Sequence, residues 1–327
     1  MRRRAVGVAV AALGERNGWV APITTVNRAN VYNIATQQVN VLREIDSRLA
    51  MDRWQVTLLV VVCRHGVADP GGSSMSAAVA GSVAIVTGGN RGIGRAFVEQ
   101  LLAGGAARVY CGARSPEDVP PELVDAGAVP VQLDVTDDAS VAAAAARCSD
   151  VTVVINNAGL HGRDRLIMAA DPGMARREME VNYFGPLAMI RAFAPVLAAN
   201  GGGAVVNVLS VAGAIPTAFM GGYSPAKSAA LFLSIIARAE LEPQHTSVTA
   251  LIVGSVDTRM ADHVDGVKED PRDIAIAGLK AMARGERICD TDAMAIQARA
   301  KYALDPVRWE RSMAKVLFSE APPSTGR

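Results

Sequence analysis

The stretch Thr87-Gly88-Gly89-Asn90-Arg91-Gly92-Ile93-Gly94 decides the fold of this chain. It directly follows an apolar run, Val83–Val86, that is typical of a buried strand, and it leads into a helical pattern. Glycines at the spacing G-x-x-x-G-x-G allow a tight turn from strand to helix and a close approach of backbone to a diphosphate. The open N–H groups and the dipole at a helix start favour an anion there. We interpret the stretch as a cofactor loop; the alternative is a purely structural turn.

Downstream of Met75, apolar runs of strand length alternate with helix-length segments. This alternation is typical of a parallel sheet covered by helices on both faces. The expected strands are Val83–Val86, Arg108–Cys111, Val129–Leu133, Val151–Ile155, Ala204–Leu209 and Ser247–Ile252, with a short seventh near Arg287–Cys289. The expected helices cover residues 92–104, 138–147, 174–199, 223–241, 271–284, 291–302 and 306–317. We therefore predict an α/β fold, a Rossmann-type doubly wound parallel sheet of six to seven strands with helices on both faces.

The composition excludes several classes of protein. Half of the 327 residues are hydrophobic, which is ample for one large core. A net charge of +1 and few aromatic residues disfavour a nucleic-acid surface, and the apolar run Val56–Cys63 is too short to span a membrane, which takes about 20 apolar residues. The four cysteines and four histidines are scattered and contain no C-x-x-C pair. We therefore expect no metal site, no membrane or nucleic-acid partner, and a reduced, cytoplasmic location.

Residues 1–74 differ from the sequence that follows. A joint rich in Gly, Ser and Pro, Asp69–Ser74, precedes Met75. We interpret residues 1–74 as an N-terminal extension that is poorly ordered or not part of the native chain, and residues 75–327 as a single dinucleotide-binding catalytic domain with a helical C-terminal extension. Met1–Arg4 and the residues after it resemble the charged and apolar regions of a signal peptide, but the apolar part is weak and no convincing cleavage pattern follows.

Tyr223 and Lys227 form the second informative pattern. Residues four apart on a helix share one face, so the phenol and the ammonium can occupy one site. An ammonium nearby favours the phenolate, and we expect it to lower the pKa of Tyr223 from its ordinary value of about 10 toward neutrality. Such a phenol is a general acid/base. The alternative is a surface Tyr and a solvated Lys, although Lys227 is the first lysine in the chain.

Ser210 follows the expected strand Ala204–Leu209, thirteen residues before Tyr223. In an open parallel sheet ligands bind at the carboxyl ends of the strands, so the Ser210 hydroxyl is expected at the mouth of the site. A Ser after a strand is by itself more often a turn or cap residue. The functional interpretation therefore depends on Tyr223 and Lys227.

Seven motifs occur together in order along the chain. They are Thr87-Gly88 through Gly92-Ile93-Gly94, Asp134-Val135, Asn156-Asn157-Ala158-Gly159, Asn182-Tyr183-Phe184-Gly185, Ser210, Tyr223 with Lys227, and Gly254-Ser255-Val256-Asp257-Thr258. With these motifs the chain resembles the classical short-chain dehydrogenase/reductase (SDR) family, densely from Val83 to Thr258 and loosely beyond. It departs from the family pattern at Val253, where many relatives carry Pro, and in its long N-terminal extension.

The resemblance implies a catalytic tetrad of Asn182, Ser210, Tyr223 and Lys227. Tyr223 would exchange a proton with the substrate oxygen, Ser210 would orient that oxygen, Lys227 would bind the nicotinamide ribose, and Asn182 would hold a water. On local grounds Asn182 could equally be a helix-bending polar residue, and Asn156 a strand-end turn. The cofactor contacts that the resemblance implies are Gly88, Asn90, Arg91, Gly92, Ile93, Gly94, Arg114, Asp134, Val135, Asn156, Ala158, Gly159, Tyr223, Lys227, Gly254, Val256 and Thr258.

The charge after the second expected strand indicates which dinucleotide is used. An acidic residue there usually binds the ribose 2′-OH of NAD, whereas an Arg accommodates the 2′-phosphate of NADP. Here the strand is followed by Arg114, with no Asp at its end, and Arg91 supplies a second cation. We predict that NADP(H) is preferred over NAD(H); the alternative is that Arg114 only faces solvent.

These features predict an NADP(H)-dependent oxidoreductase that interconverts a carbonyl and a primary or secondary alcohol. The substrate is expected to be a hydrophobic small molecule, in a pocket drawn from His161, Val211, Ile215, Phe219, Met220, Met260 and His263. The segment Asp257–Asp270 lacks apolar periodicity and is expected to be a mobile lid. By resemblance, the helices 174–199 and 223–241 would pair in a homodimer or homotetramer.

Two other functions remain open at the level of sequence. The fold could serve a non-catalytic NADP(H)-sensing protein, although such a protein would be expected to lose the acid/base residues. A nucleotide-sugar epimerase or dehydratase also uses a Tyr-Lys pair and a nicotinamide. The part of the chain after Thr258 looks too short for a separate sugar-nucleotide domain.

Overall fold

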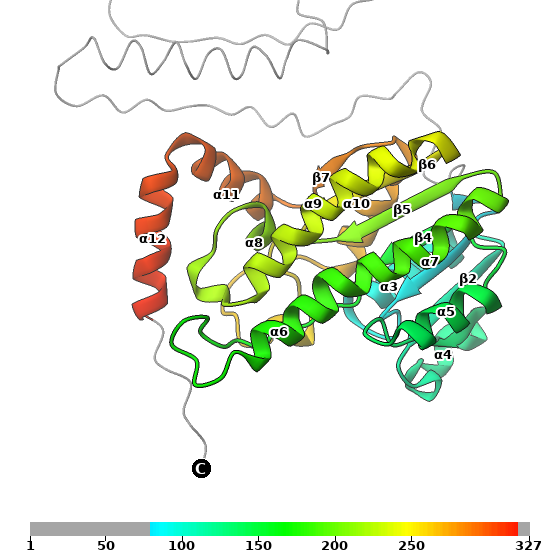
Figure 1. Cartoon of the computed structure of the whole chain (residues 1–327), viewed down its shortest axis with the longest axis horizontal. Helices are drawn as coiled ribbons and strands as arrows, with labels where there is room; N and C mark the ends of the chain where they lie inside the picture. The colour runs from blue at the N-terminus through cyan, green and yellow to red at the C-terminus, as the bar shows by residue number, and fades with distance from the viewer. Residues whose placement is uncertain (1–78, 320–327) are drawn as a thin grey trace, which may run out of the picture. The chain divides into compact units, whose positions relative to one another are not determined.

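A parallel seven-stranded sheet organises the protein (Figure 1). The computed structural model describes residues 79–319, so the predictions for residues 1–74 lie outside the described residues. The strands are β1 (Val83–Thr87), β2 (Arg108–Ala113), β3 (Ala128–Gln132), β4 (Val153–Asn156), β5 (Gly203–Val208), β6 (Thr246–Ile252) and β7 (Ile288–Asp290). Their order in the sheet is β3-β2-β1-β4-β5-β6-β7, which confirms the predicted Rossmann-type fold.

Helices cover both faces of this sheet. One face carries α3 (Gly92–Ala103) and α10 (Pro271–Ala283), and the other carries α5 (Asp138–Arg147), α7 (Gly185–Ala199) and α9 (Tyr223–Leu241), which run side by side in Figure 1. The remaining α-helices are α4 (Pro121–Asp125), α6 (Gly173–Met179), α8 (Val211–Ala214), α11 (Ala293–Leu304) and α12 (Pro306–Ser319). The short helices α4 and α8 were not expected from the sequence.

The side chains of β1 show why these runs form a two-sided sheet. Successive strand residues point to opposite faces. Val86 lies in a core with Phe97 of α3, whereas its neighbour Ile85 lies in a second core with Met189 and Phe193 of α7. Because most residues of the central strands are buried on one face or the other, these strands are rich in Val, Ile and Ala.

The strand order fixes where a ligand can bind. After β3 at one edge, the chain crosses back to β4, which pairs with β1. At such a switch point the loops after neighbouring strands separate and leave a crevice at the carboxyl ends of the strands. The glycine loop follows β1, and Ser210 follows β5, so both lie at this end of the sheet.

The expected helix 174–199 consists of three parts. Between α6 and α7 the residues Glu180–Phe184 form a π-helical turn, η3, which holds one more residue per turn than an α-helix. The run Gly173–Ala199 is long and apolar enough to cross a membrane by length and composition alone. Its apolar residues Met189, Phe193 and Leu197 are buried against the sheet, so packing in the core accounts for its composition.

Candidate active site

The loop between β1 and α3 has a backbone that requires glycine. Gly88 and Gly92 have φ angles of 62° and 53°, in the left-handed region. A Cβ atom at Gly94 would overlap the carbonyl oxygen of Gly88. No side chain caps the start of α3, so its first N–H groups are open to a ligand. The loop therefore fits the diphosphate of a dinucleotide, as the sequence predicts.

Asn157 holds this loop in place, whereas Asn156 faces the sheet. The side-chain amide of Asn157 donates to the carbonyl oxygens of Thr87 (2.9 Å) and Gly88 (3.1 Å). Asn156 is buried and donates to Asn207 Oδ1 at 2.8 Å. The resemblance implies that the motif Asn156–Gly159 lines the cofactor, with Asn156, Ala158 and Gly159 as contacts. The Asn156 side chain lies between strands, and Asn157 is the residue that the structure brings to the glycine loop.

Ser210, Tyr223 and Lys227 come together at the carboxyl end of β5. Ser210 begins α8, where its Oγ accepts from the N–H of Ala212 at 3.2 Å. Tyr223 is the first residue of α9, and Lys227 lies one turn later, with Nζ 5.8 Å from the phenol ring centroid. Lys227 Nζ also donates to the carbonyl oxygen of Val208 at 2.8 Å. All three side chains are buried, so the surface alternative for Tyr223 and Lys227 is wrong, whereas Ser210 does cap α8 in addition to lying beside Tyr223.

Asn182 connects this group to the loop after β4. Its side chain exchanges two hydrogen bonds with the backbone of Leu160, at 2.8 and 3.1 Å. A Cβ atom at Gly159 would lie 3.2 Å from Asn182 Oδ1 and 3.7 Å from Lys227 Nζ, so Gly159 lies between the two side chains. The structure thus brings all four predicted catalytic residues together. The water-holding role of Asn182 stays a prediction.

The expected lowering of the Tyr223 pKa is wrong for the protein without cofactor. Burial raises the pKa of Tyr223 to about 12, because a phenolate loses its hydration there. The Ser210 hydroxyl, placed to hydrogen-bond the phenolate, opposes part of this rise, and the nearby carboxylate of Glu178 adds to it. At neutral pH the phenol therefore carries its proton and can donate it.

Lys227 titrates near neutrality instead. Burial lowers the pKa of Lys227 from 10.5 to about 8, since its ammonium has lost most of its water. The group remains mostly charged at pH 7. The pair thus holds one proton donor that stays protonated and one ammonium that can release its proton just above neutral pH.

Two side chains near Tyr223 have environments that sequence reasoning missed. The ring of His161 lies 4.9 Å from the phenol ring, and its Nε2 is buried without a hydrogen-bond partner among the described residues. Burial lowers the pKa of His161 to about 4, so the imidazole is neutral at pH 7. The carboxylate of Glu178 is buried and accepts from the N–H of Gly162 at 2.8 Å. No local sequence signal distinguishes Glu178 from a surface residue of the helix.

Three arginines, Arg91, Arg114 and Arg259, lie on the loops after β1, β2 and β6. Partial burial and the charges of Arg259 and Arg114 lower the pKa of Arg91, and the charge of Asp118 opposes this, so these charged side chains influence one another. Among the described residues none of the three side chains forms an ion pair or a hydrogen bond. Unpaired cations of this kind suit a phosphate group. Arg91 and Arg114 were predicted from the sequence, and Arg259 was not.

The other predicted cofactor residues lie on or beside the loops that follow the strands. A Cβ atom at Gly92 would lie 3.2 Å from Thr258 Cγ2, so the loop after β6 contacts the glycine loop. The N–H of Gly254 donates to Asp292 Oδ2 at 2.7 Å, which fixes that loop on the start of α11. Asp134 Oδ1 accepts from the N–H of Thr136 at 2.9 Å. Ile93 lies in the first turn of α3, and Asn90, Val135, Ala158 and Val256 lie on the loops after β1, β3, β4 and β6.

The C-terminal helix α12 forms hydrogen bonds with two segments that lie near the catalytic group. Trp309 Nε1 donates to the carbonyl oxygen of Pro216 at 2.8 Å, and Arg165 Nη2 donates to that of Leu317 at 2.7 Å. Pro216 lies between Ser210 and Tyr223 in sequence, and Arg165 follows His161. Helix α12 therefore supports both segments that border the expected substrate pocket.

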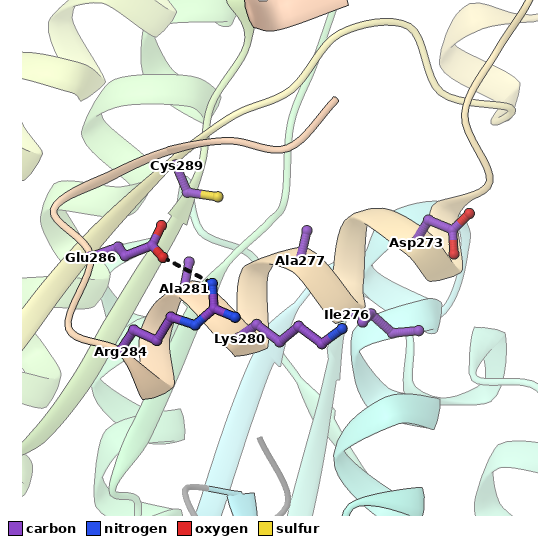
Figure 2. A pocket seen from close by; sticks show the side chains of 8 residues that line it. All are labelled: Asp273, Ile276, Ala277, Lys280, Ala281, Arg284, Glu286 and Cys289. Atoms are coloured by element: carbon purple, nitrogen blue, oxygen red, sulfur yellow. Dashed lines mark hydrogen bonds and ion pairs between the residues drawn. The ribbon is translucent and has the colours of Figure 1, made fainter. Parts of the chain in front are cut away.

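Two surface hollows lie outside this group. One, of about 270 Å³, is lined by α10 and the segment up to Cys289, with an ion pair between Arg284 and Glu286 (Figure 2). The other, of about 410 Å³, is lined by residues from Asp164 to Arg177. Neither is lined by Ser210, Tyr223 or Lys227. The described residues contain no cluster of three or more His, Cys, Asp or Glu that could hold a metal ion.

The fold and the site define a dinucleotide-binding Rossmann protein with a Ser-Tyr-Lys group at the carboxyl end of its sheet. A family model described as short chain dehydrogenase matches residues 82–268. The cis-4-hydroxycyclohexanecarboxylate dehydrogenase of Sinomonas cyclohexanicum is 32% identical over 242 residues, 71% of this chain and 96% of that protein. The crystal structure of a short chain dehydrogenase from Burkholderia cenocepacia J2315 in complex with NADP has a TM-score of 0.66 and 40% identity, covering 75% of this chain and 99% of the other.

The chain therefore belongs to the short-chain dehydrogenase/reductase family, whose members are NAD(P)-dependent oxidoreductases acting on CH–OH groups. This confirms the family resemblance of its motifs. The match spans only about three fifths of some relatives' length: dehydrogenase/reductase SDR family member 7B of Bos taurus is 33% identical over 201 residues, which cover 57% of this chain and 62% of that protein.

Proposed function

We propose that this protein is an NADP(H)-dependent oxidoreductase that interconverts a carbonyl group and a primary or secondary alcohol. The observation that carries the proposal is the buried group of Ser210, Tyr223 and Lys227, which lies at the carboxyl end of β5. The glycine loop lies at this same end of the sheet, after β1. A bound nicotinamide supplies or accepts the hydride.

The residues of the site have distinct tasks in this reaction. Ser210 orients the substrate oxygen and hydrogen-bonds the phenol. Tyr223 donates its proton to the carbonyl oxygen as that oxygen gains negative charge. Because its pKa is raised to about 12, the phenol is protonated at neutral pH, so the site favours carbonyl reduction there and alcohol oxidation at alkaline pH. Lys227 places a positive charge next to the phenol and stabilises the phenolate that remains.

A substrate panel tests the proposed activity. Ketones, aldehydes and alcohols of increasing apolar size would be assayed by the change in nicotinamide absorbance, with Tyr223→Phe as the matched control. We expect hydrophobic carbonyl compounds to be reduced, because the segments around Tyr223 contribute Ile215, Phe219 and Met220. Absence of turnover over the whole panel, with cofactor bound, would contradict the proposal and favour an NADP(H)-sensing role.

Arg114 is expected to select NADP(H) over NAD(H). The unpaired guanidinium groups of Arg91 and Arg114 suit the 2′-phosphate, and the relative from Burkholderia cenocepacia was solved in complex with NADP. Replacing Arg114 with Ala should raise the KM for NADPH by about ten-fold or more and leave the KM for NADH nearly unchanged. Arg191→Ala, which removes an exposed arginine of α7, is the control. If the variant keeps the same preference for NADPH over NADH, Arg114 does not select the cofactor.

We also propose a homodimer or homotetramer, since SDR enzymes are commonly oligomeric. Helix α9 exposes three apolar side chains on one face, Phe232, Ile235 and Ile236. The double variant Phe232→Asp/Ile236→Asp should shift the protein to a monomer in light scattering, because two buried carboxylates would oppose association. Val124→Asp, at an exposed apolar residue of α4, should leave the mass unchanged. A monomeric wild type would contradict the proposal.

The two alternatives have less support. A protein that only senses NADP(H) has no need of a buried Tyr-Lys pair joined to a Ser hydroxyl, and burying Lys227 destabilises the fold. For an epimerase or dehydratase of nucleotide sugars, the chain after the SDR motifs offers only the short turn Arg259–Ala261 and α10, β7, α11 and α12 within the described residues. These elements extend the sheet and support the active-site segments.

A further inference from the structure

Glu178 is a buried carboxylate to which the proposed reaction assigns no task. It lies on α6 with 2% of its surface exposed, and it forms no ion pair among the described residues. Burial raises the pKa of Glu178, and the hydrogen bond that it accepts from the backbone of Gly162 opposes part of this rise. A buried charge without a cation beside it destabilises a fold, so a charge kept here has a reason in the site.

The two oxygens of Glu178 face two different segments of the active site. Oε1 accepts from the N–H of Gly162, in the loop after β4, at 2.8 Å. On the other side, a Cβ atom at Gly222, the residue before Tyr223, would lie 2.6 Å from Oε2. No side chain caps α9, and the dipole at a helix start favours a negative charge there. The carboxylate thus lies between the loop after β4 and the start of α9.

The backbones around this carboxylate pack without space for further atoms. A Cβ atom at Gly221 would overlap the carbonyl oxygen of Asp164, so the loop after β4 contacts the turn before α9 directly. A Cβ atom at Gly162 would overlap the side chain of Met174, so the same loop contacts α6. Because the three segments are in contact, the position of Glu178 and the position of the loop depend on each other.

Four side chains from different elements surround the phenol of Tyr223. The Ser210 hydroxyl, at the start of α8, is placed to hydrogen-bond it, and Lys227 of α9 has its Nζ 5.8 Å from the ring centroid. The ring of His161, in the loop after β4, lies 4.9 Å away and is neutral at pH 7. Glu178 of α6 supplies the negative charge of this group, which acts against a phenolate.

We propose that Glu178 is a positioning residue of the active site: it holds the loop after β4 against the start of α9, and its negative charge sets the pH at which Tyr223 can accept a proton. This inference rests on the proposed function, because it concerns the proton that Tyr223 exchanges. In alcohol oxidation the phenolate takes the hydroxyl proton of the substrate while the hydride of the carbinol carbon leaves for the oxidised nicotinamide. A carboxylate beside the phenol reduces the fraction of phenolate that can begin this step.

The pH profile of alcohol oxidation tests the inference with Glu178→Gln, which removes the charge and keeps an oxygen for the N–H of Gly162. The alkaline rise in kcat/KM should begin at lower pH, so that at pH 8 the variant oxidises alcohols about three-fold to ten-fold faster than the wild type. Carbonyl reduction at pH 7 should stay within about two-fold, because the phenol is protonated in both proteins. Glu180→Gln, at an exposed carboxylate, is the matched control and should change neither value.

The positioning task is tested separately by Glu178→Leu, which removes both the charge and the hydrogen bond. Its kcat should fall by about ten-fold or more in both directions, since a small displacement of the catalytic groups has a large effect on the rate. Glu178→Gln should retain the kcat of carbonyl reduction. A kcat of Glu178→Leu equal to that of the wild type would contradict the positioning task.

Thermal unfolding gives a second measurement that needs no turnover. The pKa of Glu178 is higher in the folded state than its ordinary value of 4.5, so the free-energy cost of the carboxylate is absent well below pH 4.5 and is present above the folded pKa. The unfolding midpoint of Glu178→Gln, relative to that of the wild type, should therefore rise between about pH 4 and about pH 7. Glu180→Gln should show no such rise.

The other outcomes separate the inference from the proposed function. If the wild type oxidises alcohols and the alkaline rise stays at the same pH in Glu178→Gln, the inference is overturned and the proposed function stands. A difference in unfolding midpoint that does not depend on pH would show that Glu178 carries no buried charge, and would also overturn it. Absence of any turnover by the wild type would contradict the proposed function, and the inference would fail with it. If Glu178→Leu does not fold, the pH profile and the midpoints of Glu178→Gln decide.

Discussion

Replacing Tyr223 with Phe is expected to lower kcat/KM for carbonyl reduction by about a thousand-fold. The variant keeps the ring that packs against His161 and loses only the hydroxyl that donates the proton. General acid catalysis contributes about a hundred-fold to ten-thousand-fold, and this contribution is lost with the phenol proton. Steady-state kinetics with the best substrate of the panel would measure the effect.

The matched control for this change is Tyr183→Phe. Tyr183 lies in the neighbouring π-helical turn and packs edge-on against Phe184, with 4.9 Å between ring centroids. Loss of its hydroxyl should leave kcat/KM within about two-fold of the wild type, as expected for a partly exposed side chain outside the group of Ser210, Tyr223 and Lys227. A Tyr223→Phe variant that retains most of its activity would remove the phenol from the proposed chemistry.

Replacing Lys227 with Met is expected to abolish turnover and yet to stabilise the fold. The folded state lowers the pKa of Lys227 to about 8 from 10.5, which corresponds to about 3 kcal/mol against the buried ammonium at pH 7. Loss of the hydrogen bond to Val208 O offsets about 1 kcal/mol of this gain. Calorimetric unfolding should then show a midpoint about 5 °C higher at pH 7.

The pH dependence of this stabilisation has a defined sign. The pKa of Lys227 is lower in the folded state than in the unfolded state. The free-energy cost of burying its ammonium is therefore fully present below pH 8 and disappears as the pH rises toward 10.5. The difference in unfolding midpoint between Lys227→Met and wild type should therefore shrink across this range. Lys280→Met, at an exposed lysine of α10, should change neither activity nor the midpoint. A lower unfolding midpoint for Lys227→Met than for the wild type at pH 7 would contradict the inference that the buried ammonium destabilises the fold.

Local sequence patterns were sufficient to predict the sheet and most of the helices. Each expected strand lies within about two residues of an observed one, because a two-sided sheet demands continuous Val and Ile runs that are visible in the sequence. Asp138–Arg147 forms α5 as expected, where Asp137 caps its first turn. The glycine loop could also be predicted, because its backbone favours glycine at Gly88 and Gly92 and leaves no space for a Cβ atom at Gly94.

The remaining features depend on contacts between distant parts of the chain. Whether Asn156 or Asn157 faces the glycine loop depends on the pleat of β4, and a shift of one residue reverses the face. The raised pKa of Tyr223 depends on burial by α8 and α9, whereas the motif alone shows only a nearby lysine. Arg259 could not be assigned because its proximity to Arg91 arises from two loops far apart in sequence.

The π-helical turn Glu180–Phe184 has a consequence for how this chain can vary. The extra residue rotates α6 by about 100° relative to the register that α7 keeps against the sheet. Deleting a single residue there would turn Glu178 away from Gly162 and draw Asn182 off Leu160, although every apolar contact of α7 could survive. Insertions and deletions in this segment should therefore abolish the reaction, although the protein should still fold and bind the nucleotide. The length of the segment between Gly173 and Gly185 is therefore constrained in addition to the identities of Glu178 and Asn182.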